Sequence, residues 1–313
     1  MESVPYNPLL PVPPNALHEI RKIHNLDQPG RIEEAVNILR EWLQKQHHIV
    51  KKDFSDEYLE KTIISCKGSV EKSKHQIDSL STMKTIIPKF FSKFNVKSEL
   101  KDVLDITWFV PLPKMTKDLY RVIVVRISDK PYTAENLMQF FQYTVITVEY
   151  IKAHDYVNGF IVIYDYSRIN IMELMTKLNI TELQQFVTLL IDGYGARVKA
   201  VHIMTESKAI ELLIKTIKQF VSAKIGDRMH VQSSLEDLHK VVPKEVLPEE
   251  YGGTEDSIEK FHNAWIDALS SEQHVEYLKM MSKACTDESK RPSGKLNEEY
   301  MGMPGSFRHL SVD

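Results

Sequence analysis

Cysteine and glycine are scarce in this chain. Its 313 residues hold only two cysteines, Cys66 and Cys285, and 11 glycines. Two cysteines so far apart give no disulfide framework and no cysteine-rich zinc site, and they fit a reducing compartment. The P-loop, the dinucleotide fingerprint, the G-x-S-x-G elbow and the H-E-x-x-H zinc motif are all missing from the sequence. We therefore expect no catalytic residues, no metal site and no cofactor.

Long hydrophobic runs and a strong net charge are also lacking. Lys, Glu or Gln interrupts every apolar stretch, so none predicts a membrane span, and the N-terminus does not resemble a signal peptide. The net charge of −3 gives no general attraction to nucleic acid. These absences predict a soluble, cytoplasmic, monomeric protein without a nucleic-acid partner.

Hydrophobic periodicity divides the chain into four parts. Residues 1–15 hold five of the 14 prolines and predict a flexible arm. Residues 16–100 repeat apolar side chains at helical spacing and predict a helical segment without strands. Residues 101–265 predict an α/β domain, and residues 266–313 predict a C-terminal helix followed by a polar tail.

Short β-branched runs alternate with helical stretches in the α/β part. The predicted strands are 121–127, 160–164, 197–204 and 228–232, and the predicted helices between them are 134–152, 181–192 and 208–224. Alternation of this kind implies parallel strands joined by right-handed crossovers. The fold class is therefore α/β, with a mostly parallel β-sheet flanked by helices.

Several polar residues in this scaffold invite a catalytic or metal-binding role. Asp165 follows a strand where α/β sheets bind ligands, but it lacks an evident nucleophile or histidine partner, so turn capping is favoured. His202 stands among apolar strand residues and is expected to be a hydrogen-bonded core residue. His47 and His48 have no suitably spaced partners, which favours a solvated helix terminus over a metal site.

The predicted helix 208–224 carries an apolar stripe that includes Ile210, Leu213 and Ile217, with lysines on its opposite side. Two interpretations remain open. The helix is either an ordinary surface helix packed on the sheet, or a mobile lid that closes a cavity and turns its lysines to lipid headgroups.

Four stretches, taken in order, resemble the CRAL-TRIO lipid-transfer family. They are 63–74 (IISCKGSVEKSK), 157–165 (VNGFIVIYD), 197–203 (RVKAVHI), and a closing signature made of 238–240 (LHK) and 247–253 (LPEEYGG). The resemblance covers roughly residues 30–265 and is greatest to the branch of the α-tocopherol transfer and cellular retinaldehyde-binding proteins.

The resemblance implies an apolar pocket in a CRAL-TRIO domain, closed by the lid helix 208–224. The side chains that it implies at or beside this pocket are Phe160, Tyr164, Phe186, Leu189, Leu190, Tyr194, Val198, Val201, Leu213, Ile214 and Ile217. In the tocopherol-transfer branch a basic cleft binds phosphoinositide headgroups. The matching positions in this chain are Lys67, Arg197, Lys199, Lys224 and Arg228.

The resemblance thus implies a non-enzymatic intracellular carrier of a tocopherol, retinoid or similar isoprenoid. Its hydrophobic lipid ligand would be released at phosphoinositide-containing membranes, which the protein visits transiently. The alternative is a phosphoinositide-sensing adaptor without a transferred cargo. One departure from the family pattern concerns the lid, because Gly195 stands where the family usually has a proline.

Overall fold

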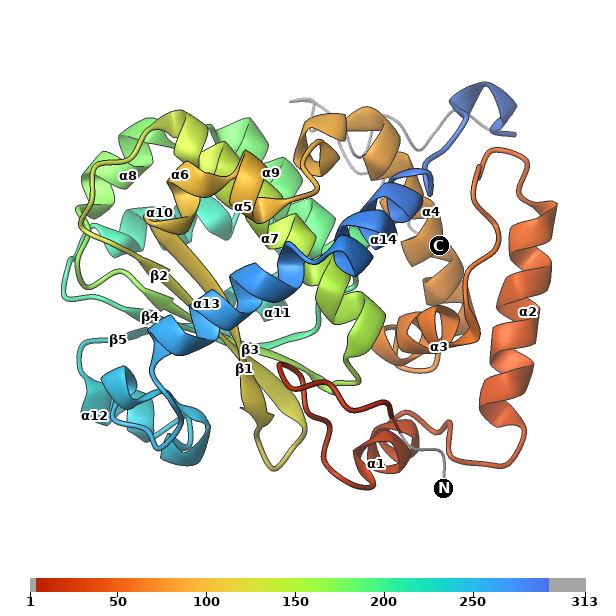
Figure 1. Ribbon diagram of the computed structural model, residues 1–313, viewed down its shortest axis with the longest axis horizontal. Helices are drawn as coiled ribbons and strands as arrows, with labels where there is room; N and C mark the ends of the chain where they lie inside the picture. The colour runs from red at the N-terminus through yellow and green to blue at the C-terminus, as the bar shows by residue number, and fades with distance from the viewer. Residues whose placement is uncertain (1–3, 293–313) are drawn as a thin grey trace, which may run out of the picture.

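The computed structural model describes residues 4–292. Its N-terminal part consists of helices α1 (Ala16–Ile23), α2 (Arg31–Lys45), α3 (Asp56–Ser65) and α4 (Val70–Ile86), which lie together at one end of the molecule (Figure 1). Ser55 begins α3, because its hydroxyl accepts a hydrogen bond from the backbone N–H of Tyr58. The N-terminal helical segment is confirmed.

These N-terminal helices have a hydrophobic core of their own. Ile20 of α1, Leu39 of α2 and Ile63 of α3 are fully buried within it. Helix α4 belongs to two cores, since Ile77 packs in this one and Met83 packs in the main core of the α/β part. The helical segment is therefore attached to the rest of the protein along α4.

Five strands form one sheet in the order β1-β2-β3-β4-β5. They are β1 (Thr107–Met115), β2 (Tyr120–Ile127), β3 (Gly159–Asp165), β4 (Val198–Met204) and β5 (Met229–Gln232). Strands β2 to β5 pair in parallel, and β1 pairs with β2 antiparallel. The mostly parallel sheet is confirmed, and each of the four predicted strands is found within one residue of its predicted ends.

Strand β1 was not predicted. Pro111 and Pro113 interrupt its hydrophobic run, and proline cannot donate to a strand ladder. The structure accommodates both prolines because β1 is an edge strand, paired on one side only within the described residues. The edge position thus explains a strand that the sequence pattern argued against.

The remaining helices connect or cover the strands. They are α5 (Val96–Glu99), α6 (Lys101–Leu104), α7 (Ala134–His154), α8 (Ile171–Lys177), α9 (Ile180–Thr188), α10 (Ile210–Ile217), α11 (Ala223–Gly226), α12 (Leu235–His239), α13 (Ile258–Leu269) and α14 (Glu272–Ser282). Two predicted helices are shorter than expected. Helix α9 passes into a π-helical turn at Leu189–Gly193, and the helix predicted at 208–224 is divided into α10 and α11.

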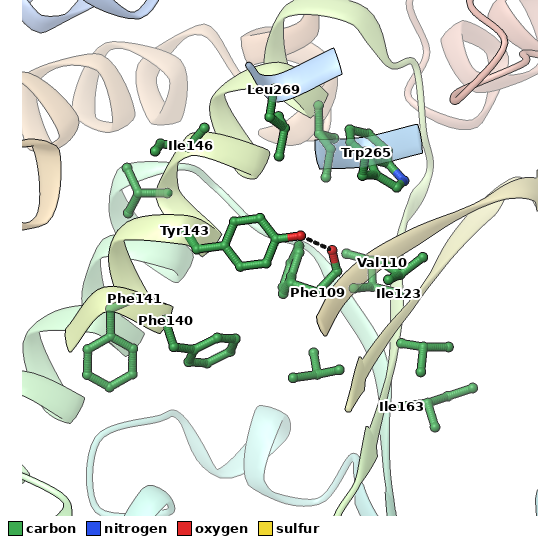
Figure 2. Packing of buried hydrophobic residues seen from close by; sticks show 14 of the residues in the cluster. Phe109, Val110, Ile123, Phe140, Phe141, Tyr143, Ile146, Ile163, Trp265 and Leu269 are labelled. Carbon is green, nitrogen blue, oxygen red and sulfur yellow. Dashed lines mark hydrogen bonds between the residues drawn. The ribbon is translucent and has the colours of Figure 1, made fainter. Parts of the chain in front are cut away.

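Helix α7 is the central helix of the main core, with α13 and α14 beside it (Figure 1). Tyr143 of α7 is fully buried, and its hydroxyl donates a hydrogen bond of 3.3 Å to the carbonyl of Phe109 in β1 (Figure 2). Trp265 of α13 is also buried and donates from its indole nitrogen to the carbonyl of Pro111 at 2.9 Å. Two aromatic side chains therefore attach the edge strand to the helices.

Both terminal segments are packed where they are described, which corrects the expectation of a flexible arm and a polar tail with little to bury. In the arm, Leu10 is 1% exposed, and the Asn7 side chain donates to the Tyr150 hydroxyl at 3.1 Å. Near the C-terminus, Arg291 makes two hydrogen bonds of 2.9 and 3.0 Å to the Asp78 carboxylate of α4. Residues 293–313 of the predicted tail lie outside the described residues.

Candidate functional site

A cavity of about 260 Å³ lies between one face of the sheet and the helices that follow its strands. Its wall on the sheet side includes Ile123 of β2, Val162 of β3 and Val201 of β4. The wall is almost entirely apolar, so water gains few hydrogen bonds inside. A hydrophobic molecule is the ligand that such a cavity suits.

Strand β3 shows how the sequence builds this wall. Phe160, Val162 and Tyr164 line the cavity and are only half-buried, because part of each side chain faces its free space. Ile161 and Ile163 alternate with them and are buried on the opposite face of the sheet. One strand therefore supplies both a cavity wall and a packed core.

Asp165 joins this strand to the closing signature of the domain. One carboxylate oxygen accepts from the backbone N–H and hydroxyl of Ser167 at 3.1 and 2.6 Å, which confirms the turn-capping role. The other accepts a 2.8 Å hydrogen bond from the Tyr251 hydroxyl. Burial, followed by the charge of Asp165, raises the pKa of Tyr251, so the phenol remains a donor.

Aromatic and aliphatic side chains form the opposite wall. Phe141 of α7 and Phe186 of α9 stack with their ring centroids 4.3 Å apart, and Phe140 lies beside them. Leu213 and Ile217 of α10 complete this wall. These two side chains belong to the apolar stripe of α10. The stripe therefore faces the cavity, as the lid interpretation requires.

The structure brings most of the sequence-predicted pocket residues together. Those that line the cavity are Phe160, Tyr164, Phe186, Leu190, Tyr194, Val198, Val201, Leu213 and Ile217. Leu189 is instead fully buried in the main core, and Ile214 packs beside a smaller cluster of core residues between α8 and β4. Leu189 and Ile214 therefore flank the cavity. Contact with a lipid remains a prediction for every residue of the predicted pocket.

One end of the cavity was missed by sequence reasoning. Lys61 and Ser65 of α3 and Lys152 of α7 line it, so the N-terminal helices contribute part of the wall. Lys152 lies one helical turn after Val148, and both line the cavity from α7. A lysine that interrupts an apolar stripe is the signal that could have identified this polar end.

Four of the five predicted headgroup cations lie close enough for their charges to repel one another. We call these four residues, Lys67, Arg197, Lys224 and Arg228, the basic cluster. The pKa of Lys67 is lowered first by the charge of Arg197, then by burial and by other cations that include Lys224 and Arg228. In residues 4–292, none of these four takes part in an ion pair of 4.0 Å or less. The fifth cation, Lys199, stands over the Tyr120 ring at 5.7 Å.

The two arginines of the basic cluster are also structural. Arg197 donates to Nε2 of His24 at 2.6 Å and to the side-chain oxygen of Asn158 at 3.2 Å. Burial, together with the charges of Arg197 and Lys67, lowers the pKa of His24 to about 4, which keeps this ring neutral and able to accept. Arg228 donates to the backbone carbonyl of Val198 in β4.

Gly195 lies between the π-helical turn and β4, at a position that only glycine fits well. Its φ of +66° is in the left-handed region, and a Cβ atom there would lie 2.6 Å from the side-chain oxygen of Gln76. The proline that the family usually carries is confined to φ near −65°, so it cannot adopt this conformation. The chain therefore approaches α4 more closely here than a proline would allow.

The histidines are placed differently from one another. His202 is 3% exposed, and its Nδ1 lies 3.2 Å from the side-chain nitrogen of Gln232, which confirms a hydrogen-bonded core residue. His47 is exposed, but His48 is buried against Asp78 at 2.6 Å, so the expectation of a solvated terminus is wrong for His48. Tertiary contact with α4 explains the difference.

Neither a metal site nor a membrane span emerges from the described part of the chain. In residues 4–292, no three His, Cys, Asp or Glu side chains are grouped so that they could hold a metal ion. No helix in the same residues is both long and apolar enough to cross a membrane.

Comparison with known proteins agrees with this architecture. Residues 106–253 match the CRAL/TRIO domain, and residues 28–100 match the UBA domain of Pinta-like proteins. The crystal structure of Sfh5 superposes with a TM-score of 0.51 at 12% identity, covering 80% of this chain and 96% of that one. This likeness shows a shared fold.

Two groups of relatives share sequence with the chain. The α-tocopherol transfer protein-like protein of Mus musculus is 26% identical over 227 residues, which cover 70% of this chain and 64% of the relative. Clavesin-1 of Rattus norvegicus is 33% identical over 99 residues, which cover 31% of this chain and 28% of the relative. The matched region thus spans less than two thirds of either relative. Residues 106–253 therefore form a CRAL/TRIO domain, and this match together with the relatives confirms the resemblance to the CRAL-TRIO family.

Proposed function

We propose that this protein is a non-enzymatic cytoplasmic carrier that binds a small hydrophobic lipid in its cavity and transfers it between membranes. CRAL-TRIO proteins bind lipophilic ligands, and the cavity of about 260 Å³ is the observation that carries the proposal. Removing an apolar ligand from water stabilises the complex by about 25 cal/mol per Å² of surface buried. Because the cavity is formed before the ligand enters, little of this binding free energy is lost to ordering the protein.

A tocopherol, a retinoid or a similar isoprenoid is one class of cargo that this cavity would accept. The support is a relative named for tocopherol transfer and a wall rich in aromatic rings. Lipid extraction from the purified protein followed by mass spectrometry tests the proposal. A recovered hydrophobic lipid is the expected result. A protein that contains no lipid and takes none from vesicles would contradict it.

Phosphoinositide binding at the basic cluster would couple lipid release to a membrane. The four cations lack carboxylate partners in the described residues, so a multivalent anion would relieve their mutual repulsion. Cluster residues are also adjacent in sequence to cavity residues. Ala196 and Val198 flank Arg197, and Ile225 follows Lys224. An anion at the cluster would therefore act directly on the cavity wall, with a coupling of about 1–3 kcal/mol.

The double variant Lys67→Gln, Lys224→Gln tests this coupling. Both side chains are exposed, whereas the two arginines also bond protein groups and would confound the result. We expect phosphoinositide-stimulated lipid transfer between vesicles to fall about tenfold, with basal transfer unchanged. Lys45→Gln, Lys101→Gln removes the same charge from exposed lysines of α2 and α6, outside the lid, and serves as the control. Equal stimulation in both double variants would refute the coupling.

The alternative is a phosphoinositide-sensing adaptor without a transferred cargo. It would need a cavity filled by the protein's own side chains, and the free volume supports the carrier instead. Native mass spectrometry separates the two functions. Protein that binds a phosphoinositide headgroup but never holds a lipid tail would favour the adaptor.

A further inference from the structure

Two lysines line the polar end of the cavity without an anionic partner. Lys61 of α3 donates to the backbone carbonyl of Ala153 at 2.6 Å, and its ammonium lies 4.7 Å from the centre of the Tyr156 ring. Lys152 of α7 donates to the Thr62 hydroxyl at 3.0 Å. Within residues 4–292, neither lysine forms an ion pair of 4.0 Å or less.

The buried carboxylates around these lysines are already paired with other cations, whereas Glu57, one turn before Lys61 in α3, is exposed to solvent. Glu60 accepts from Arg21 at 2.7 Å. Glu149 accepts from Lys84 at 2.8 Å, and both side chains are nearly inaccessible to solvent. Asp155 accepts two hydrogen bonds from the buried Arg121, of 2.8 and 2.9 Å. The polar end of the cavity therefore carries positive charge in excess of its buried carboxylates.

This excess charge is unfavourable in the empty cavity. Burial lowers the pKa of Lys152 to about 8, and nearby Cys66 and Glu149 oppose that shift only in part. Burial likewise lowers the pKa of Lys61, and the charge of Lys61 further lowers that of Lys152. A buried ammonium is stabilised by an anion that shares its low-dielectric surroundings.

We infer that Lys61 and Lys152 form a headgroup site inside the cavity, and that the cargo is a single-chain lipid ending in an anionic group. A carboxylate or a phosphate monoester provides this chemistry, with its tail along the apolar wall. The inference deepens the proposed carrier function and rests on it. It narrows the proposed cargo to lipids with an anionic end and selects against neutral tocopherols and retinoids, which the apolar wall alone would also accept.

Two probes that share one tail and differ in the charge of the headgroup test the site. Parinaric acid and its methyl ester share one fluorescent tail, and their fluorescence changes when the tail enters an apolar cavity. We expect the wild-type protein to bind the acid at least tenfold more tightly than the ester. The double variant Lys61→Met, Lys152→Met is expected to bind both probes with the ester's affinity.

Matched variants show whether charge and position are responsible. Lys61→Arg, Lys152→Arg keeps both charges and is expected to retain most of the preference for the acid. Lys45→Met removes one exposed lysine of α2 and is expected to leave both affinities unchanged. Oleate and oleoyl lysophosphatidate, used as competitors, distinguish the two sources of the anion. Stronger competition by oleate would show that the site prefers a carboxylate, and stronger competition by oleoyl lysophosphatidate would show that it prefers a phosphate.

Three outcomes would overturn the inference. Equal affinity of the wild-type protein for acid and ester removes the headgroup site but leaves the carrier function standing, and this comparison needs no variant to fold. A preference for the acid that survives in the folded double methionine variant rules out these two lysines. Binding of neither probe contradicts the carrier function and the inference together.

Discussion

The two ends of the cavity are formed by different parts of the chain and differ in polarity. The apolar end lies between the sheet and helices α7, α9 and α10, where Phe141, Phe186 and Leu213 contribute. The polar end adds α3 and the last turn of α7, with Lys61 and Lys152. Apolar surface provides affinity that grows with area and discriminates weakly. We therefore expect the end that carries charge to decide which lipid is bound.

Tyr194 connects the two ends. Its ring lines the cavity, and its hydroxyl donates to the same Glu149 oxygen that accepts from Lys84, at 2.9 and 2.8 Å respectively. Burial raises the pKa of Tyr194, so it stays protonated. A change at the buried charges would therefore be felt at the cavity wall.

The largest effect on stability is expected when the buried ion pair between Lys84 and Glu149 is broken. Lys84→Met leaves Glu149 buried without its cation and should lower the free energy of unfolding by about 3–5 kcal/mol. Urea unfolding measures it. Lys89→Met, which removes an ion pair with Glu182 where Lys89 is 46% exposed, should cost less than about 1 kcal/mol. Similar small losses in both variants would show that the buried pair contributes little.

The next effect tests the apolar end. Phe186→Ala removes a buried ring that stacks on Phe141 and should cost about 3 kcal/mol of unfolding free energy. The variant should also weaken the binding of parinaric acid and its methyl ester by the same factor, because the ring contacts only the tail. A changed ratio of the two affinities would contradict the separation of the cavity into two functional ends.

A smaller effect is expected at Gly195, which lines the cavity and approaches α4. Gly195→Ala combines a positive φ with a clash against Gln76 and should cost about 2–3 kcal/mol. Gly30→Ala has a similar φ of +77° but no atom within 4 Å, so it should cost about 1 kcal/mol. The difference between the two unfolding free energies measures the close approach to α4. Equal losses would mean that Gln76 moves away without cost.

The smallest effect concerns pH at the basic cluster beside the polar end. The pKa of His24 is about 4 in the folded protein, against 6.5 for an unperturbed histidine, so the unfolded state takes up a proton first as the pH falls. Stability from this residue is complete above pH 6.5 and is lost toward pH 4, with about 1 kcal/mol lost at pH 5.5.

The variant His24→Gln isolates this contribution. Unfolding free energies at pH 7.5 and 5.5 should differ by about 1 kcal/mol less in the variant than in the wild-type protein. His47→Gln changes an exposed histidine and should leave the wild-type difference intact. An unchanged pH dependence in His24→Gln would show that the pKa of His24 is not lowered in the folded protein.

Local patterns predicted the regular elements well and the buried polar contacts poorly. The strand 160–164 was recognised because its β-branched run is a property of adjacent residues. Apolar side chains at helical spacing predicted helices within residues 16–100, yet Asp78 and Lys84 of α4 are also buried. Their partners, Arg291 and Glu149, are 213 and 65 residues away along the chain, a relation that no local pattern contains.

The sequence by itself determined the α/β fold class, the strands of the parallel sheet and the apolar stripe of α10, because each depends on spacing along the chain. It also located Lys67, Arg197, Lys224 and Arg228 through the family resemblance. Only the tertiary structure decided that these cations gather in one cluster and that Lys61 and Lys152 line the cavity. A lysine on a helix has the same local pattern whether it faces water or a cavity, and the packing of α3 and α7 around the sheet makes that choice.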